Sequence, residues 1–332
     1  MTWFEKLMGF EERTPEQVRE NIEIIGNRLI SKVNQQEYVY GSLELPSLEE
    51  LRNNRDLDKY HSKIKISEVV GNAQQLHQDE KNDGAFFQVA SQFNLLEMSN
   101  PYRTPEAGVG IYEYDATQGP ACAVACGAGT VYRNYFVDLQ TQRGQSENRQ
   151  VDCLAEIGRE LGNVNNRLWQ MMNGYALANE QGLITIAEKL DSMSVGEYES
   201  LKGKLQIGVQ RDTQVTIGSG NNRITQAYCS ALPVAYTSVA AGLWEPFARL
   251  VLEAGYEAAF YAALTNYENR GNNLVFLTLV GGGVFGNKPE WIFDAMQKSI
   301  DKFKSTPLDI KIVSFINSKP HVRQFVESMK EG

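Results

Sequence analysis

Hydrophobic positions along the chain follow two periods, and their order predicts a sheet with helices packed against it. Strand-like segments lie at 63–66 and 85–90, and apolar runs long enough for buried strands lie at 274–280 and 310–316. From Glu245 the spacing becomes helical, with Phe247, Val251 and Ala258 on one face. This alternation indicates an α/β fold in which helices cover both faces of the sheet.

The first sixty residues predict a helical extension. Thr14 to Gln17 resembles a capping box, and the apolar residues that follow, through Val33, recur at helical spacing. Ser47 to Glu50 repeats the start signal for a short second helix. Polar stretches at 140–149 and 191–202 indicate surface connections, and 203–217 indicates a hairpin or two short strands. We find no internal repeat and no low-complexity linker, and therefore expect an extension at 1–60 and one domain at 61–332.

The apolar run at 274–280 ends in a glycine-rich turn that leads into a helix. The turn comprises Gly281, Gly282, Gly283, Val284, Phe285, Gly286 and Asn287. We expect Asn287 to cap the helix and Glu290 to complete a capping box, with Pro289 in the first turn. Clustered glycines let backbone N–H groups point to one place, where they and the helix N-terminus can hold a phosphate. The turn lacks the Gly-Lys-Ser/Thr ending of an ATP-binding loop, and a purely structural turn is the alternative.

A group of polar residues follows the segment at 85–90. Asn94, Glu97, Glu106, Asp115 and Gln118 lie between it and the Gly119-Pro120 start of a helix of small residues. Residues beyond the carboxyl ends of strands line the ligand crevice in open α/β sheets. We therefore expect the acids to bind ribose hydroxyls or to activate water. The alternative is that they face solvent, which we favour for Glu113.

Composition and charge narrow the function classes. A net charge of -9 without a basic patch argues against nucleic-acid binding, and no apolar stretch is long enough to span a membrane. The three histidines are scattered and the four cysteines form no CxxC pair, so we expect buried free thiols, no metal site and no cofactor. We expect a cytoplasmic monomer that binds neither nucleic acid nor membrane.

Several phrases in the chain resemble the macrodomain family. They are FNLLEM (93–98), DATQGPACA (115–123), YRNYF (132–136), NGYAL (173–177), YCSALPVAY (228–236) and LVGGGVFGN (279–287). They look most like the divergent, poly(ADP-ribose)-glycohydrolase-like group that includes the MavL-type effector hydrolases. The resemblance covers roughly residues 63–316.

This resemblance implies a macrodomain-like fold, with a mixed, mostly parallel sheet and helices on both faces, that binds ADP-ribose. It implies that Asn94 and the first loop, with Gln118 and Gly119, contact the distal ribose, and that residues 281–287 wrap the diphosphate. It also implies hydrolysis of ADP-ribose from arginine side chains, with Asp115, Glu97 and Glu106 as the catalytic acids. If the protein is a secreted effector, it would act in a host cytosol.

The chain departs from the family at two places. Phe93-Asn94 is followed by Leu-Leu-Glu where macrodomains usually continue to a glycine loop, and the paired glutamates of the glycohydrolases are missing, because Gly286-Asn287 follows the glycine run. Cleavage of poly(ADP-ribose) chains is therefore not expected. The predicted partner is ADP-ribose or an ADP-ribosylated protein, and the alternative function is an ADP-ribose or nucleotide binding module without chemistry.

Overall fold

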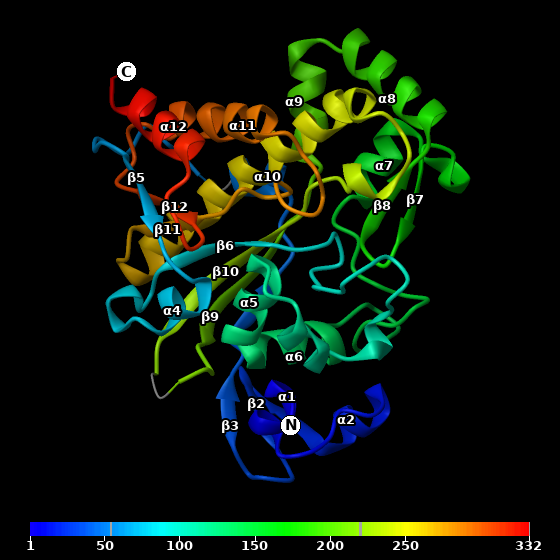
Figure 1. Cartoon of the computed structure of the whole chain (residues 1–332), viewed down its shortest axis with the longest axis vertical. Coiled ribbons are helices and arrows are strands. Elements are labelled where there is room, and N and C mark those ends of the chain that lie inside the picture. The colour runs from blue at the N-terminus through cyan, green and yellow to red at the C-terminus, as the bar shows by residue number, and fades with distance from the viewer. Residues whose placement is uncertain (54, 219–220, 332) are drawn as a thin grey trace.

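The computed structural model describes residues 1–53, 55–218 and 221–331, and a seven-stranded mixed sheet forms its centre (Figure 1). From β10 to β5 all neighbours pair in parallel, whereas β9 pairs antiparallel with both β10 and β4. The predicted mostly parallel α/β sheet is confirmed. In spatial order the strands are β4 (Ser42–Glu44), β9 (Gly208–Gln214), β10 (Arg223–Cys229), β6 (Phe86–Ala90), β11 (Leu274–Leu277), β12 (Asp309–Ser314) and β5 (Lys65–Val70).

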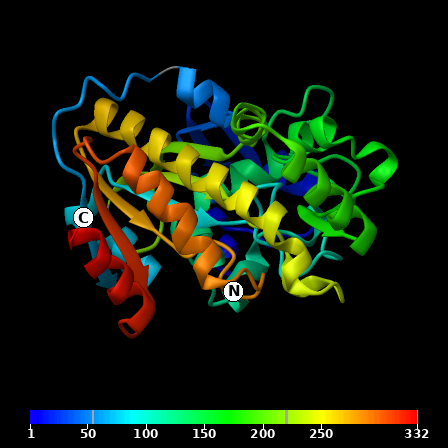
Figure 2. The ribbon, with the colours of Figure 1, turned by 90° about the horizontal axis from the view of Figure 1, so that it is seen from above.

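Helices cover both faces of this sheet. Figure 2 shows α10 (Ala241–Arg270) crossing one face with α11 (Pro289–Lys302) beside it. The helix α12 (Pro320–Glu331) packs against α11 through Phe293 and Phe325, whose ring centroids are 4.8 Å apart. The opposite face carries α4 (Ala73–Gln78), α5 (Gln118–Ala125) and α6 (Gly127–Tyr135).

The sheet is apolar on both sides because successive side chains of a strand point to opposite faces. Phe86 and Val275 belong to the core shared with α10, whereas their neighbours Phe87 and Phe276 belong to the core on the other face. Phe87 and Phe276 stack there with ring centroids 4.5 Å apart. Strands without exposed faces explain the continuous apolar runs in the sequence.

A second group of elements extends the molecule beyond one end of α10. The hairpin of β7 and β8 turns at Asn173-Gly174, and both residues have positive φ. The helix α9 replaces the polar connection predicted at 191–202, and a capping box between Ser194 and Glu197 starts it. These elements are α7 (Ala155–Leu161), β7 (Trp169–Met172), β8 (Tyr175–Ala178), α8 (Glu180–Ser192) and α9 (Val195–Gly203). The short helix α3 (Leu48–Asn53) lies beside α10, where Arg52 pairs with Glu257.

The prediction of a helical extension at 1–60 is wrong. The capping box at Thr14 starts only the short helix α2, after which the chain forms a hairpin whose turn contains Gly26 with φ of 59°. Ile25 and Val33, placed on the buried face of the expected helix, are 55% and 50% exposed. The elements here are α1 (Trp3–Met8), α2 (Pro15–Asn21), β1 (Ile22–Ile25), β2 (Arg28–Ser31) and β3 (Glu37–Val39).

The boundary expected at residue 60 also differs from the structure. β4 already pairs with β9 in the central sheet, and the short helix predicted at 47–50 is α3, which packs on the same body. The helix predicted from Glu245 is confirmed as part of α10, which begins at Ala241. No helix in the described ranges has the length and hydropathy needed to cross a membrane.

Candidate functional site

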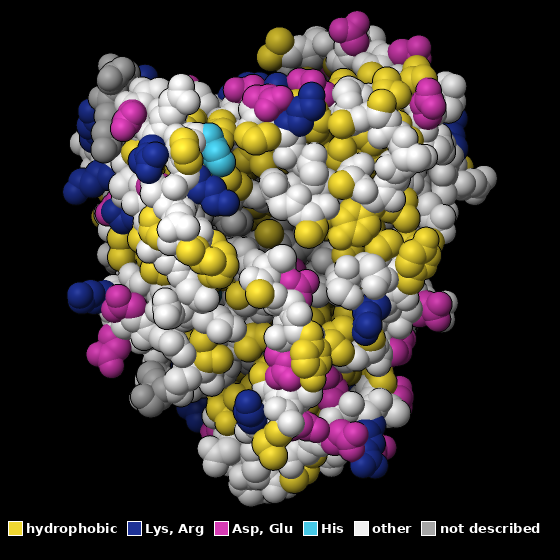
Figure 3. Space-filling model, viewed as in Figure 1, with side chains coloured by type: hydrophobic (Ala, Val, Ile, Leu, Met, Phe, Trp, Pro, Cys, Tyr) yellow, Lys and Arg dark blue, Asp and Glu magenta, His cyan; other side chains and the backbone are white. Residues whose placement is uncertain are grey.

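A cavity of about 540 Å³ opens where the central strands end. It is lined by residues that follow the carboxyl ends of four neighbouring parallel strands: Asn72 after β5, Ser91 after β6, Thr278 after β11 and Phe315 after β12. Figure 3 shows the surface hollowed near the centre of this face. The carboxyl edge of the sheet is where ligands bind in open α/β folds, so the cavity occupies the position that the sequence predicted.

The glycine-rich turn after β11 forms one wall of this cavity. Gly281 has φ of 77°. Two backbone hydrogen bonds close the turn: Gly282 N donates to Leu279 O (3.0 Å), and Asn287 N donates to Gly281 O (3.0 Å). Within the described chain, the N–H groups of Gly283, Val284 and Phe285 have no hydrogen-bond acceptor. Three consecutive free donors at the rim of a cavity can bind an anion such as a phosphate.

The helix start after this turn differs from the prediction. Asn287 is buried and its side chain donates to Leu232 O (2.8 Å), so it does not cap α11. Lys288 occupies the N-cap position without a side-chain hydrogen bond, and Pro289 stands in the first turn as expected. Gly286 and Asn287 do not line the cavity, whereas Gly281 to Phe285 do. Asn287 therefore anchors the turn to the protein interior and does not contact the cavity.

Glu97 lies in the opposite wall, in the loop after β6. Its side chain lines the cavity although the residue is only 5% exposed, and its Oε1 atom has no hydrogen-bond partner in the described chain. Burial raises the pKa of Glu97 well above its ordinary value; the guanidinium of Arg133 opposes this and the carboxylate of Asp115 adds to it. The protonated form of Glu97 is therefore favoured, which makes it a hydrogen-bond donor or an acid.

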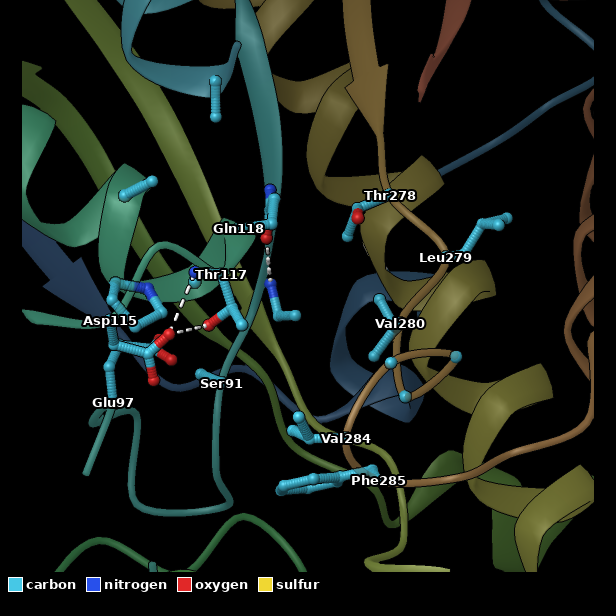
Figure 4. Close-up of a pocket in the computed structure, with 18 of the residues that line it drawn as sticks. Ser91, Glu97, Asp115, Thr117, Gln118, Thr278, Leu279, Val280, Val284 and Phe285 are labelled. Atoms are coloured by element: carbon cyan, nitrogen blue, oxygen red, sulfur yellow. Dashed lines mark hydrogen bonds between the residues drawn. The ribbon is translucent and has the colours of Figure 1, made fainter. Parts of the chain in front are cut away.

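Asp115 stands beside Glu97 in a more open position (Figure 4). Its Oδ1 atom accepts hydrogen bonds from Thr117 N (2.9 Å) and Thr117 Oγ1 (2.7 Å), just before α5 begins. These two bonds fix the carboxylate at the cavity wall, and its other oxygen has no partner among the described residues. Asp115 is thus an oriented acceptor, suited to a ribose hydroxyl or to water.

Gln118 and Gly119 bring α5 against the end of β6. Gln118 accepts from Ala90 N and donates to Gln88 O, both at 2.9 Å, so its amide is used within the protein although the residue lines the cavity. A Cβ atom at Gly119 would overlap Ala90 O and Glu97 Oε2. Only glycine at this position lets α5 come so close to the end of β6. Gln118 and Gly119 therefore help to hold the cavity wall that contains Glu97.

Two more residues predicted for the site lie outside the cavity. Asn94 is fully buried in a tight turn, where Leu96 N donates to its Oδ1 (3.1 Å) and its Nδ2 donates to Gln150 (2.8 Å). Glu106 is exposed and accepts a hydrogen bond from Glu147 N (2.9 Å). Neither residue lines the cavity. Position in sequence after the strand end misled both predictions, because a tight turn buries Asn94 and a short 3-10 turn at Pro105–Ala107 leaves Glu106 exposed.

The solvent-facing alternative holds for Glu113. It is exposed, and its carboxylate accepts a hydrogen bond from Trp3 N (2.8 Å) at the start of α1. All four cysteines are free and buried, as predicted. Within the ranges that the structure describes, no three His, Cys, Asp or Glu side chains come together in an arrangement that could hold a metal ion.

Aromatic residues line the cavity, and of these Phe285 and Tyr236 were candidates from the sequence whereas Tyr175 was not. Tyr175 at the start of β8 and Tyr236 after β10 line it together with Phe285 of the glycine turn. From the sequence, Tyr228 and Tyr236 could equally stack on a base or belong to the core, whereas the NGYAL phrase indicated only a turn. Tyr228, in the same phrase as Tyr236, is buried under the Arg133 guanidinium, 3.7 Å from the ring centroid, and does not line the cavity.

No protein-family model matches the sequence, and no curated protein matches it. The fold is similar to poly(ADP-ribose) glycohydrolase from Deinococcus radiodurans in complex with ADP-ribose, at 10% identity and a TM-score of 0.46 over 87% of this chain and 95% of that chain. It is also similar to poly(ADP-ribose) glycohydrolase from Thermomonospora curvata, at 9% identity and a TM-score of 0.45 over 95% of each chain. At such identities and TM-scores the similarities identify neither the family nor the activity of this chain.

Proposed function

We propose that this protein is a hydrolase that releases ADP-ribose from modified side chains by cleaving the glycosidic bond at C1 of the ribose. One observation carries the proposal: two carboxyl groups and a turn with three free N–H donors face each other across one cavity (Figure 4). The donors suit a diphosphate, and the carboxyl groups suit the ribose next to it. A cavity of about 540 Å³ lies in the size range of nucleotide-sized ligand sites.

The reaction would proceed through an oxocarbenium-like state at C1. Asp115, held by Thr117, would take a proton from the attacking water, while the proton on Glu97 would hydrogen-bond a ribose hydroxyl or protonate the leaving group. In arginine-linked ADP-ribose the C1–N bond breaks and a C1–O bond to water forms. When Glu97 protonates the guanidine nitrogen, Asp115 holds the proton from water until solvent carries it back to Glu97, so that one water is consumed overall. The diphosphate on the glycine turn would fix C1 in front of the acids, so binding energy remote from the bond serves orientation.

Arginine is the acceptor that we propose. A protonated guanidinium is attracted by the carboxylate of Asp115 in the wall, and the resemblance of the FNLLEM and DATQGPACA phrases to arginine hydrolases supports the same choice. The protein is proposed to act on ADP-ribosylated protein in the cytoplasm, or in a host cytosol if it is exported.

The test is incubation with an arginine-ADP-ribosylated protein, with detection of free ADP-ribose by chromatography. We expect release with multiple turnovers. Saturable binding of ADP-ribose without release from the modified protein would favour the binding module instead. If the protein neither releases nor binds ADP-ribose, the cavity is not an ADP-ribose site. A serine-linked substrate run in parallel determines whether the activity depends on the acceptor.

A further inference from the structure

Three aromatic rings from distant parts of the chain meet at the wall of the cavity. The ring centroids of Tyr175 and Tyr236 are 5.1 Å apart, those of Tyr175 and Phe285 are 5.3 Å apart, and those of Tyr236 and Phe285 are 5.5 Å apart. Their interplanar angles lie between 46° and 74°, which are the tilted and edge-on geometries that aromatic pairs favour. We call these three residues the aromatic trio.

Two members of the trio, Tyr175 and Phe285, are buried in the protein. Tyr175 is 1% exposed, and its hydroxyl donates to Met98 O (2.7 Å) and accepts from Gln92 Nε2 (3.4 Å). Phe285 is 8% exposed and belongs to the glycine turn. Tyr236 is only half-buried, so it is the ring of the trio with the most surface left for a ligand.

Tyr175 connects the trio to the cavity wall that holds the acids. Burial is the first cause that raises the pKa of Tyr175; the neighbouring Tyr236 follows, and the charges of Glu97 and Asp115 contribute further. Met98, which accepts the Tyr175 hydrogen bond, follows Glu97 directly in the chain. Tyr236 lines the same cavity as Asp115. An accessible aromatic ring in a cavity that also holds a carboxylate is a favourable environment for a cation, and a guanidinium is planar and stacks on such rings.

We infer that Tyr236, held in place by Tyr175 and Phe285, binds the guanidinium of the arginine acceptor through a cation–π contact and thereby determines the acceptor specificity. The inference rests on the proposed function, since it assumes that ADP-ribose occupies the cavity with its ribose toward the acids. Tyr236 takes no part in bond cleavage. It contacts the half of the substrate that leaves.

The test measures binding in an Asp115→Asn background, so that the substrate is not consumed. The dissociation constants of an ADP-ribosylarginine peptide and of free ADP-ribose are compared by calorimetry for Tyr236, Tyr236→Phe and Tyr236→Leu. We expect Tyr236→Leu to weaken binding of the peptide roughly tenfold relative to ADP-ribose, and Tyr236→Phe to stay within about twofold, because the ring is retained.

Two outcomes would overturn the inference. If Tyr236→Leu loses affinity equally for the peptide and for ADP-ribose, Tyr236 contacts the ribose or the base and not the arginine. If the peptide binds equally well to the proteins with Tyr, Phe and Leu at 236, Tyr236 does not contribute to recognition. Loss in both Tyr236→Phe and Tyr236→Leu would assign the effect to the hydroxyl and would likewise reject a cation–π contact. A failure of the proposed hydrolysis appears separately, as a wild-type protein that binds the peptide without releasing ADP-ribose.

Discussion

At the scale of single residues, the two acids of the cavity differ in environment although they lie side by side. Glu97 is buried with an unpaired carboxyl oxygen, whereas Asp115 is partly open and is oriented by Thr117. Two titratable groups whose surroundings favour different protonation states are the arrangement that acid–base chemistry needs. The sequence indicated both residues by their place after a strand, but only the fold distinguishes their environments.

Asp115→Ala is expected to lower turnover by roughly two or more orders of magnitude, because the variant loses the positioned base. The affinity for ADP-ribose should fall far less, since the glycine turn is intact. The measurement is single-turnover release of ADP-ribose together with calorimetry. Glu106→Ala is the matched control: this acid lies in the same stretch of chain but outside the cavity, and its variant should hydrolyse at nearly the wild-type rate. Equal losses in the two variants would contradict the assignment.

Glu97→Gln tests whether the proton on Glu97 is used. Burial raises the pKa of this group, so the wild-type protein should lose turnover as the pH rises through that pKa and Glu97 becomes charged. Glu97→Gln should reduce turnover by roughly two orders of magnitude and should lack this alkaline decline, because the amide does not titrate. An alkaline decline of the same shape in the variant would show that another group titrates.

At the scale of elements, the order of strand, glycine turn and helix at 274–302 was predicted, apart from the cap at Asn287, because its signals are local. An apolar run, clustered glycines and a proline at the first helical turn need no distant partner. The hairpin at 22–31 was missed for the opposite reason. Its apolar residues fit a helical period as well as a strand, and packing of Ile22 and Leu29 against α1 and α6 selects the strand.

Gly283→Val is expected to weaken ADP-ribose binding by roughly two orders of magnitude, because a side chain would occupy the space in front of the free N–H groups. A Cβ atom at Gly283 meets nothing within 4 Å, so the melting temperature should change little.

At Gly281 the same substitution would meet Asn287 at 2.7 Å in a backbone with φ of 77°, and it should destabilise the protein instead. Gly242→Val, also in open space but outside the cavity lining, is the control. Unchanged ADP-ribose affinity in Gly283→Val, measured by calorimetry, would reject the phosphate assignment.

At the scale of the whole molecule, a buried group of charges connects helices that the chain places far apart. Arg52 of α3 pairs with Glu257 of α10 (2.7 Å), and Lys302 of α11 donates to the same carboxylate (2.5 Å). Lys202 of α9 lies 3.5 Å from Glu257. In the sequence these residues are indistinguishable from solvent-facing charges of amphipathic helices, so the connection could not be predicted before the helices were placed together.

Glu257→Gln is expected to lower the free energy of unfolding by about 3 kcal/mol near neutral pH, because Arg52 and Lys302 lose a buried partner. Burial alone would raise the pKa of Glu257, but hydrogen bonds from Arg52 and Lys302 lower it to about 2. A lowered folded-state pKa contributes stability that is present above the unfolded pKa and is lost as the pH falls through the folded one. The difference in free energy of unfolding between wild type and variant should therefore shrink between about pH 4.5 and about pH 2, as measured by urea unfolding at several pH values.

The control is Glu16→Gln, which removes an exposed pair with Arg19 and should change the free energy of unfolding by less than about 1 kcal/mol. A Glu257→Gln difference that stays constant down to low pH would show that the charge of Glu257 does not hold these helices together.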